Sequence, residues 1–440
     1  MSRLNFALFI ILSWLLVSCA TTAQPTDATG MAQTNTLPES ELRGTVSFMV
    51  LGDTAEKATF DELVARFEAL HDQVTVELIY IPSQGDYRRR LMSDFLTGTP
   101  ADVTLINYRR YAQFAAKKLL EPLGPYLEQS KVIQESDFYS QVLAPYYWNG
   151  SLMCIPHGFS GLAVYYNKKL FDAAGVEYPS NDWNWEQFLQ TAKALTQDSD
   201  GDGETDIYGL GTDATVSHIA PFIWMNRGEI VNDPAKPRAL ALDSPPSREA
   251  LEWFIALQVT HQVVPDFVKE QAESSESRFM NGTLAMFLNS RRGVSTYRQV
   301  QNLDWDVAPL PQGKSRANVL NADGFCLSAA SENKLAAWAL IEFANSVEGQ
   351  TILAQSGRIV PSLKTVAESP AFLNSEQKPA NSQIFLDDIP EIRAVPVLEN
   401  WADIEIAISE EMEFAFHGGA TLDAAIDAAV IRSRGFWPKK

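Results

Sequence analysis

The stretch from Gly161 to Gly211 constrains the fold more than any other part of this 440-residue chain, because strands and helices alternate there with their end signals in place. A strand over 163–166 leads into a helix with Asn167 as its N-cap and Gly175 as its left-handed terminator. A second amphipathic helix is predicted from Asn184 in capping-box spacing. An acidic glycine loop and another strand follow. The order predicts an α/β structure.

The first part of the chain shows the same alternation. Strands are predicted over 45–51, 74–80 and 102–106, with an amphipathic helix over 60–70 after the first and another over 87–96 after the second. This order predicts parallel pairing with crossover helices.

Length and charge restrict the architecture and the partners. A chain of 440 residues is too long for one core, which predicts two lobes. The formal charge of −20 argues against nucleic acid or an anionic membrane surface as the partner, since both bind a basic face. It fits a protein that stays soluble and monomeric outside the cytoplasm.

The N-terminus has the pattern of an export signal. Arg3 precedes an apolar run over 6–17 that is short for a membrane span but suits a signal-peptide core. The run ends in Leu-Val-Ser-Cys, which resembles a bacterial lipoprotein cleavage box and makes Cys19 the lipidated first residue of the mature chain. An ordinary secretory signal cut nearby is the alternative. The residues from 20 to about 40 are too polar to form a core and are interpreted as a tether.

Several segments match a known family in the right order. "YYNKKLF", "AAGVEYP", "WNWEQF", "DGDG…YGL", "GTPADVTLIN", "RFMNGTLAMFLNS" and "WDVAPLPQG" resemble the extracellular solute-binding proteins of ABC importers, most of all those for sugars and oligosaccharides. The resemblance implies a type II periplasmic-binding-protein fold, with a ligand cleft between two α/β lobes joined by a multi-strand hinge. The division that it implies is a signal peptide over 1–18, a lipidated tether over 19–43, a first lobe over 44–154 with 327–369, and a second lobe over 155–326 with 370–440.

The resemblance implies a binding function. We expect the cleft to capture a mono- or oligosaccharide and deliver it to the permease of an ABC importer, with a lipid anchor holding the protein outside the cytoplasm. Alternatives are a non-sugar solute such as glycerol phosphate, or a sensor that presents its ligand complex to a signalling receptor. An enzyme is disfavoured because no nucleophile, phosphate-loop or metalloprotease motif occurs, and no cofactor is required.

Sugar sites combine aromatic platforms with planar polar and charged side chains. The resemblance places such residues mostly at strand ends around the cleft. The ligand-binding candidates are Asp53, Asn107, Tyr108, Arg109, Phe159, Ser160, Trp224, Asn289, Arg291, Asp323 and Trp401.

Some of these candidates have a second interpretation. Trp224 and Trp401 fit a core as well as a sugar platform, and Arg109 fits a solvated helix start for which Asn107 is the cap. Arginines at positions 109 and 291 would also suit a carboxylate or phosphate on the ligand.

The acidic loop has most of a calcium-loop pattern. Asp198, Asp200, Asp202 and Asp206 occupy positions one, three, five and nine of that pattern, but Gly209 stands where the bidentate Glu would be. A structural Ca²⁺ site and a solvated acidic turn both remain open.

Two cysteines follow the signal region. Cys154 and Cys326 lie in segments that resemble the hinge crossings of the family, which run side by side. A disulfide there would restrict hinge motion, so buried free thiols are the safer expectation, and the pairing stays open.

Overall fold

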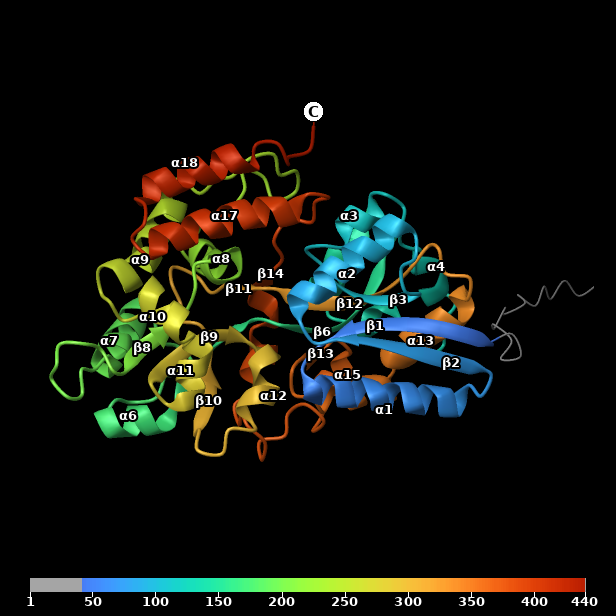
Figure 1. The fold of residues 1–440 in the computed structure, drawn as a ribbon, viewed down its shortest axis with the longest axis horizontal. Coiled ribbons are helices and arrows are strands. Elements are labelled where there is room, and N and C mark those ends of the chain that lie inside the picture. The colour runs from blue at the N-terminus through green and yellow to red at the C-terminus, as the bar shows by residue number, and fades with distance from the viewer. Residues whose placement is uncertain (1–41, 440) are drawn as a thin grey trace, which may run out of the picture. The chain divides into compact units, whose positions relative to one another are not determined.

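A computed structural model describes residues 42–439, which belong to one compact unit. Two main sheets organise this unit, and Figure 1 shows them side by side with their helices. The six-stranded sheet has the order β13 (Val360–Pro361), β6 (Cys154–Ser160), β12 (Asn321–Leu327), β3 (Val103–Asn107), β1 (Gly44–Leu51), β2 (Val74–Ile81). The four-stranded sheet has the order β10 (Trp305–Ala308), β7 (Leu162–Asn167), β9 (Leu284–Ser290), β8 (Tyr208–Gly211). We call the first sheet with its helices the first lobe, and the second sheet with its helices the second lobe.

Both sheets are mixed. Strand β1 pairs in parallel with β2 and β3, as the alternation of strands and helices predicted. Strands β12, β6 and β13 add to this sheet in antiparallel pairing, which the sequence did not predict. In the second lobe, β7 runs antiparallel to β9 and β10, whereas β8 and β9 are parallel.

The helices of the first lobe are α1 (Thr54–Leu70), α2 (Gln84–Thr97), α13 (Lys334–Ala344) and α14 (Val347–Ala354). Helix α1 buries Phe60, Leu63 and Phe67, the stripe expected from its helical period. Helix α2 begins earlier than predicted because Ser83 caps it, its Oγ accepting from the amide N–H of Asp86 at 3.2 Å.

The second lobe confirms the end signals read from the sequence. Helix α6 (Lys168–Ala174) starts at the Asn167 cap and stops at Gly175, which has a φ of 65°. Helix α7 (Trp185–Leu195) starts with the Asn184 capping box. The other main helices here are α8 (Val216–Met225), α9 (Pro245–Val259), α11 (Ser275–Asn281), α17 (Trp401–Phe416) and α18 (Leu422–Ser433).

Short elements complete the described chain. They are α3 (Ala112–Ala115), α4 (Gly124–Leu127), α5 (Ser140–Leu143), α10 (Phe267–Ala272), α12 (Val294–Tyr297), α15 (Lys364–Ala367), α16 (Ile384–Asp387), β4 (Tyr147–Trp148), β5 (Ser151–Leu152), β11 (Asn318–Val319) and β14 (Ile392–Arg393), with 3-10 turns between some of them. None of the helices within 42–439 has the length and apolar character that crossing a membrane requires.

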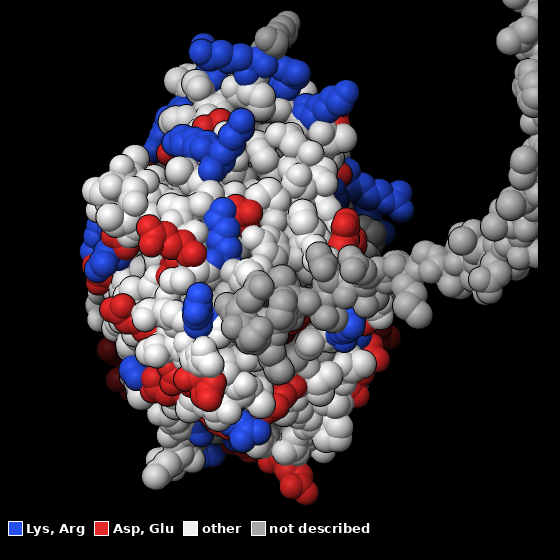
Figure 2. Space-filling model, turned by 90° about the vertical axis from the view of Figure 1, so that its right-hand side faces the viewer, with Lys and Arg blue, Asp and Glu red and all other residues white. Residues whose placement is uncertain are grey.

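On the face drawn in Figure 2, acidic and basic side chains are interspersed.

The chain passes between the lobes at several places. Strand β6 of the first lobe continues into β7 of the second through Gly161, and the stretch after β10 returns to the first lobe through β12. A later passage follows α15, since Lys378 already donates to the Leu303 carbonyl of the second lobe at 2.8 Å. Strands β11 and β14 pair in parallel beside these passages. The lobe boundaries given under Sequence analysis stay a prediction, and the signal peptide, Cys19 and nearly all of the tether lie outside the described residues.

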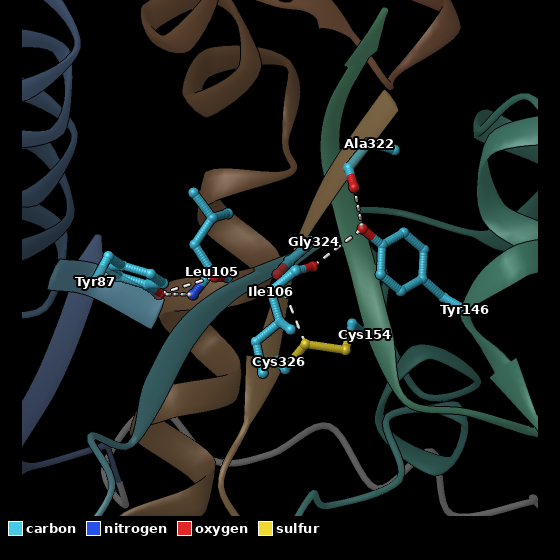
Figure 3. The surroundings of a disulfide bond; sticks show 8 residues. All are labelled: Tyr87, Leu105, Ile106, Tyr146, Cys154, Ala322, Gly324 and Cys326. Atoms are coloured by element: carbon cyan, nitrogen blue, oxygen red, sulfur yellow. Dashed lines mark hydrogen bonds between the residues drawn. A yellow bond between two sulfur atoms is a disulfide. The ribbon is translucent and has the colours of Figure 1, made fainter. Parts of the chain in front are cut away.

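The disulfide corrects the expectation of free thiols. Cys154 of β6 and Cys326 of β12 are direct partners in the antiparallel register, with Cα atoms 4.4 Å apart, and their sulfur atoms are bonded. Figure 3 shows the bond beside Tyr146, whose hydroxyl donates toward the Ala322 carbonyl at 3.0 Å. Both cysteines belong to one sheet, so the bond ties two strands of the first lobe to each other. It does not tie the lobes together, which removes the objection that it would restrict the hinge.

Candidate functional site

A cavity of about 560 Å³ lies between the two sheets, and we call it the cleft. The first lobe contributes the ends of β1 and β3, the starts of α1 and α2, the second half of β6 and the start of β12. The second lobe contributes the segment after β8, the end of β9 and one face of α17. Strand ends and helix starts therefore meet here from both lobes, so the exposed backbone and side-chain polar groups of each lobe face the same space.

The structure brings six of the eleven predicted ligand residues into the cleft wall. They are Asn107, Arg109, Phe159, Ser160, Asn289 and Asp323. The other five, Asp53, Tyr108, Trp224, Arg291 and Trp401, are outside this wall.

Asp53 has a structural role at the edge of the cleft. One carboxylate oxygen caps α1 by accepting from the amide N–H of Glu56 at 2.9 Å. The other accepts from the hydroxyl of Ser295, which lies in α12 of the second lobe. Asp53 thus connects the lobes and has no free oxygen directed at a ligand.

The predicted aromatic platforms are core residues. Tyr108 and Trp401 are fully buried. The Tyr108 hydroxyl donates to the Leu320 carbonyl at 3.2 Å and accepts from the Val395 amide N–H at 3.1 Å. Trp224 is buried in α8, with the Arg393 guanidinium 4.5 Å from its ring. Within 42–439, the aromatic residues that line the cleft are Phe159 and Phe287.

Arg291 is replaced in the cleft wall by its neighbour. The side chain of Arg291 is 1% exposed and lies between Phe372 and Phe385, 4.4 and 5.0 Å from their ring centres. Burial lowers its pKa to about 9. Arg292, the next residue, lines the cleft instead. The sequence identified the right segment, but the phase of the turn after β9 decides which arginine reaches the solvent.

Several cleft residues were missed. They are Glu56 of α1, Arg88 of α2, Arg110 after β3, Asp213 after β8, Arg358 before β13 and Glu405 of α17. Asp213 had a usable signal, because it lies two residues after the buried strand β8, much as Asn107 lies at the end of β3. No sequence signal singled out Glu405 or Arg88, since each is one of several polar residues on its helix.

Arg109 spans the cleft. Its guanidinium contacts the Glu405 carboxylate at 2.6 Å and donates to the Ser217 hydroxyl at 2.7 Å, both in the second lobe. It also donates to Asn321 on its own side. Burial alone would lower the pKa of Arg109, but the nearby Glu405 outweighs this effect and raises it. Arg109 is therefore a fixed cation whose charge is largely neutralised by the protein.

Two groups in the cleft are kept neutral by burial. Burial raises the pKa of Glu56 to about 8, against the opposing effect of the Arg358 guanidinium 2.7 Å away. Burial also lowers the pKa of His157 to about 4. The Nδ1 atom of His157 is buried without a hydrogen-bond partner. At neutral pH the cleft thus offers an uncharged imidazole and a protonated carboxyl, groups suited to hydrogen bonds with hydroxyls.

The second histidine of the cleft is fully engaged. Nδ1 of His218 lies 2.6 Å from the Asp213 carboxylate and 3.0 Å from the Thr215 hydroxyl. Its Nε2 faces the Leu288 carbonyl at 3.4 Å. Burial opposes the charge of His218, but Asp213 outweighs it and raises the pKa of the imidazole. Thr215 shares Nδ1 with a carboxylate, so this group does not form an activated nucleophile.

The acidic loop brings three of its four predicted carboxylates together. Oxygens of Asp198, Asp200 and Asp206 all lie within 4.8 Å of one another, whereas Asp202 is not part of this group. The loop also satisfies itself, because Asp198 accepts from the amides of Gly201 and Gly203 at 2.7 and 2.9 Å. The calcium site stays a prediction.

The chain is similar to known binding proteins over most of its length. A model of the family described as bacterial extracellular solute-binding protein matches residues 62–380. A putative binding protein of Brucella abortus (strain 2308) is 25% identical over 386 residues, covering 85% of this chain and 88% of that one. The erythritol/L-threitol-binding protein of Mycolicibacterium smegmatis is 22% identical over 308 residues, covering 64% of this chain and 63% of that one.

Among solved structures, the ABC substrate-binding protein Lmo0181 of Listeria monocytogenes in complex with cycloalternan has a TM-score of 0.81 at 24% identity. The match covers 89% of this chain and 99% of that one. The likeness confirms the predicted two-lobed α/β fold.

Proposed function

Because the chain belongs to the bacterial extracellular solute-binding protein family, we propose that it is the substrate-binding component of an ABC importer and that its solute is a carbohydrate. The protein acts outside the cytoplasm, as this family does. It captures the sugar in the cleft and passes it to a membrane permease whose ATPase is a separate chain.

The main support for this proposal is the polar cleft that both lobes build. Its volume of about 560 Å³ lies within the range of about 300–1,000 Å³ found for small-molecule sites. The neutral groups Glu56 and His157 and the carboxylate of Asp323 lie on the first lobe, and Asn289 lies on the second. A molecule ringed with hydroxyls can give and accept hydrogen bonds on all of these groups at once.

The composition of the wall favours a compact ligand. Long oligosaccharides are held by stacking on Tyr and Trp, and neither residue type lines the cleft within 42–439. A short saccharide or sugar alcohol, held mainly by hydrogen bonds, fits better. The names of similar proteins agree with the class, since one binds erythritol and L-threitol and another was solved with cycloalternan.

Capture works by closing the hinge. Contacts already join the lobes at the cleft, including Arg109 with Glu405 and Asp53 with Ser295. A ligand that touches both lobes adds to these contacts only in the closed form, so it shifts the population toward closure. The permease then receives the closed complex.

The anchor is a further part of the proposal. Cys19 carries lipid and holds the monomeric protein at the membrane, because several acyl chains on one residue give stable attachment. Replacing Cys19 with Ala should move the protein from the membrane fraction to the soluble fraction. Recovery of the variant in the membrane fraction would contradict the lipoprotein assignment.

A thermal-shift screen tests the function. Purified protein is melted with neutral mono- and oligosaccharides, sugar alcohols, acidic sugars and glycerol phosphates, since a ligand specific for the folded state raises Tm as its concentration exceeds Kd. We expect a saturable rise with one class of carbohydrate. Asp323→Asn, in the cleft wall, should reduce that rise, whereas Asp427→Asn, exposed on α18, should not. A rise with non-carbohydrates alone would overturn the proposal.

A further inference from the structure

Most charged side chains of the cleft neutralise one another. Arg109 contacts Glu405 at 2.6 Å, and Arg358 contacts the carboxylate of Asp53, at the edge of the cleft, at 3.5 Å. The imidazole of His218 lies 2.6 Å from Asp213.

Some of the charged side chains that line the cleft have no oppositely charged partner. Within 42–439, Arg88, Arg110, Arg292 and Asp323 line the cleft without an oppositely charged atom within 4.0 Å. Three arginines thus stand against one aspartate. The unmatched part of the cleft is cationic although the whole chain is strongly acidic, with a formal charge of −20.

Two of these arginines lie together on the wall of the first lobe. Arg88 and Arg110 both line the cleft and also a side pocket of about 70 Å³ that shares several residues with it. Arg88 is exposed and Arg110 is half-buried, and both guanidinium groups remain cations at neutral pH. The same side pocket holds one carboxylate, that of Asp323, against these two cations. One positive charge is therefore left over, and an anion between the arginines would balance it.

Arg88 differs from the two arginines that follow it in helix α2. Three arginines follow one another in α2, and two of them are paired within the helix: Arg89 with Asp86 and Arg90 with Asp94. Arg88 lies one turn after Gln84 and one turn before Met92, which line the same side pocket. It is the arginine of this run that faces the cleft, and it is the one without a carboxylate.

The side pocket is a small extension of the cleft. Its volume of about 70 Å³ compares with about 560 Å³ for the cleft, so it suits a substituent of the ligand such as a carboxylate or phosphate. Its floor includes Leu91, Leu105 and Phe114, and such apolar surroundings strengthen charge–charge contacts. Planar guanidinium groups bind both kinds of anion through paired hydrogen bonds.

We propose that Arg88 and Arg110 form a subsite for an anionic substituent, so that the solute is an acidic carbohydrate carrying a carboxylate or a phosphate. This inference rests on the proposed function and narrows its substrate class. The neutral groups of the cleft hold the hydroxyls of the sugar, and the arginine pair holds its acidic group.

The test compares acidic sugars with their neutral parents by isothermal titration calorimetry. Hexuronic acids and their short oligomers, hexose phosphates and the corresponding neutral sugars are titrated into the purified full-length protein in detergent. We expect an acidic sugar to bind at least tenfold more tightly than its neutral parent. The uronate and phosphate arms show which anion the subsite takes.

Variants assign the effect to the two arginines. Arg88→Gln combined with Arg110→Gln should weaken binding of the acidic sugar by about tenfold more than it weakens binding of the neutral parent. Arg89→Gln is the matched control, because Arg89 is adjacent in sequence, exposed and outside both pockets. Equal affinities of the double variant and the control for the acidic sugar would overturn the inference.

A salt series gives an answer that needs no variant. Affinity of the wild-type protein for the acidic sugar should fall between about 0.02 M and about 0.3 M salt, while that for the neutral parent stays constant. Neutral sugars binding as tightly as acidic ones would overturn the subsite and leave the carbohydrate function standing. Binding of glycerol phosphate with no response to any sugar would support the arginine subsite and overturn the carbohydrate function.

Discussion

The guanidinium of Arg109 and the carboxylate of Glu405 join the two lobes across the cleft, with Nη1 and Oε1 2.6 Å apart. Arg109 follows β3 in the six-stranded sheet, whereas Glu405 lies on α17, which packs against α8 and α9 of the second lobe. Their side chains are 10% and 13% exposed, so the contact is only weakly screened by solvent. The pair therefore contributes to the balance between open and closed forms.

Breaking this pair should favour the open form. Glu405→Gln leaves Arg109 with a hydrogen bond in place of an ion pair, at a cost of about 2 kcal/mol to the closed form. We expect a larger radius of gyration in small-angle X-ray scattering of the ligand-free protein. Glu411→Gln is the control, because Glu411 pairs with Arg432 between α17 and α18 of the same lobe. Identical scattering curves for the two variants would contradict the prediction.

Asp53 and Ser295 provide a second contact between the lobes. Asp53→Ala removes both this contact and the α1 cap, and the loss of a cap costs about 1 kcal/mol. Ser295→Ala removes only the contact. We expect both variants to expand in scattering, and Asp53→Ala to have the lower midpoint in urea unfolding. Equal midpoints would show that the cap contributes nothing measurable.

The disulfide should stabilise the fold without affecting the hinge. It closes a loop with a sequence separation of 172 residues, for which the chain-entropy model gives about 5 kcal/mol. Replacing Cys154 and Cys326 with Ala should lower the free energy of unfolding by about that amount. Ligand affinity should change less than about twofold, because both cysteines lie in one sheet. A large change in affinity would show that the bond influences closure.

His157 should make stability fall in acid. Its pKa is lowered from 6.5 to about 4 in the folded protein, so the unfolded chain takes up a proton between these values and the folded one does not. The stability contributed by neutral His157 is complete above about pH 6.5 and is lost as pH falls toward 4, by about 1.4 kcal/mol per pH unit.

The variant His157→Phe isolates this effect. The imidazole packs against Phe325 and Phe60, with ring centres 5.1 and 6.5 Å away, so an aromatic replacement suits the site. Urea unfolding at pH 7 and pH 5 should give a smaller loss of stability for the variant than for the wild type. Equal losses would assign the acid sensitivity to other groups.

The local order of the chain could be predicted from the sequence. The Asn167 cap, the Gly175 terminator and the Asn184 capping box depend on residues within one turn of one another, so they can be read without knowing the partners of a helix. The end of the strand predicted over 102–106 likewise indicated Asn107, and the family resemblance indicated Asp323 before the return to the first lobe; both line the cleft.

What only the tertiary structure decided is the direction of individual side chains. Arg88 faces the cleft while Arg89 pairs on its own helix, and Arg292 takes the place expected for Arg291. The direction of each depends on how a helix or turn is rotated against its neighbours, and long-range packing sets that rotation. The pairing of Cys154 with Cys326 depends in the same way on strands far apart in the sequence. The sequence alone therefore determined the lobes and the segments around the cleft, and packing between distant segments determined which charges the cleft presents to its ligand.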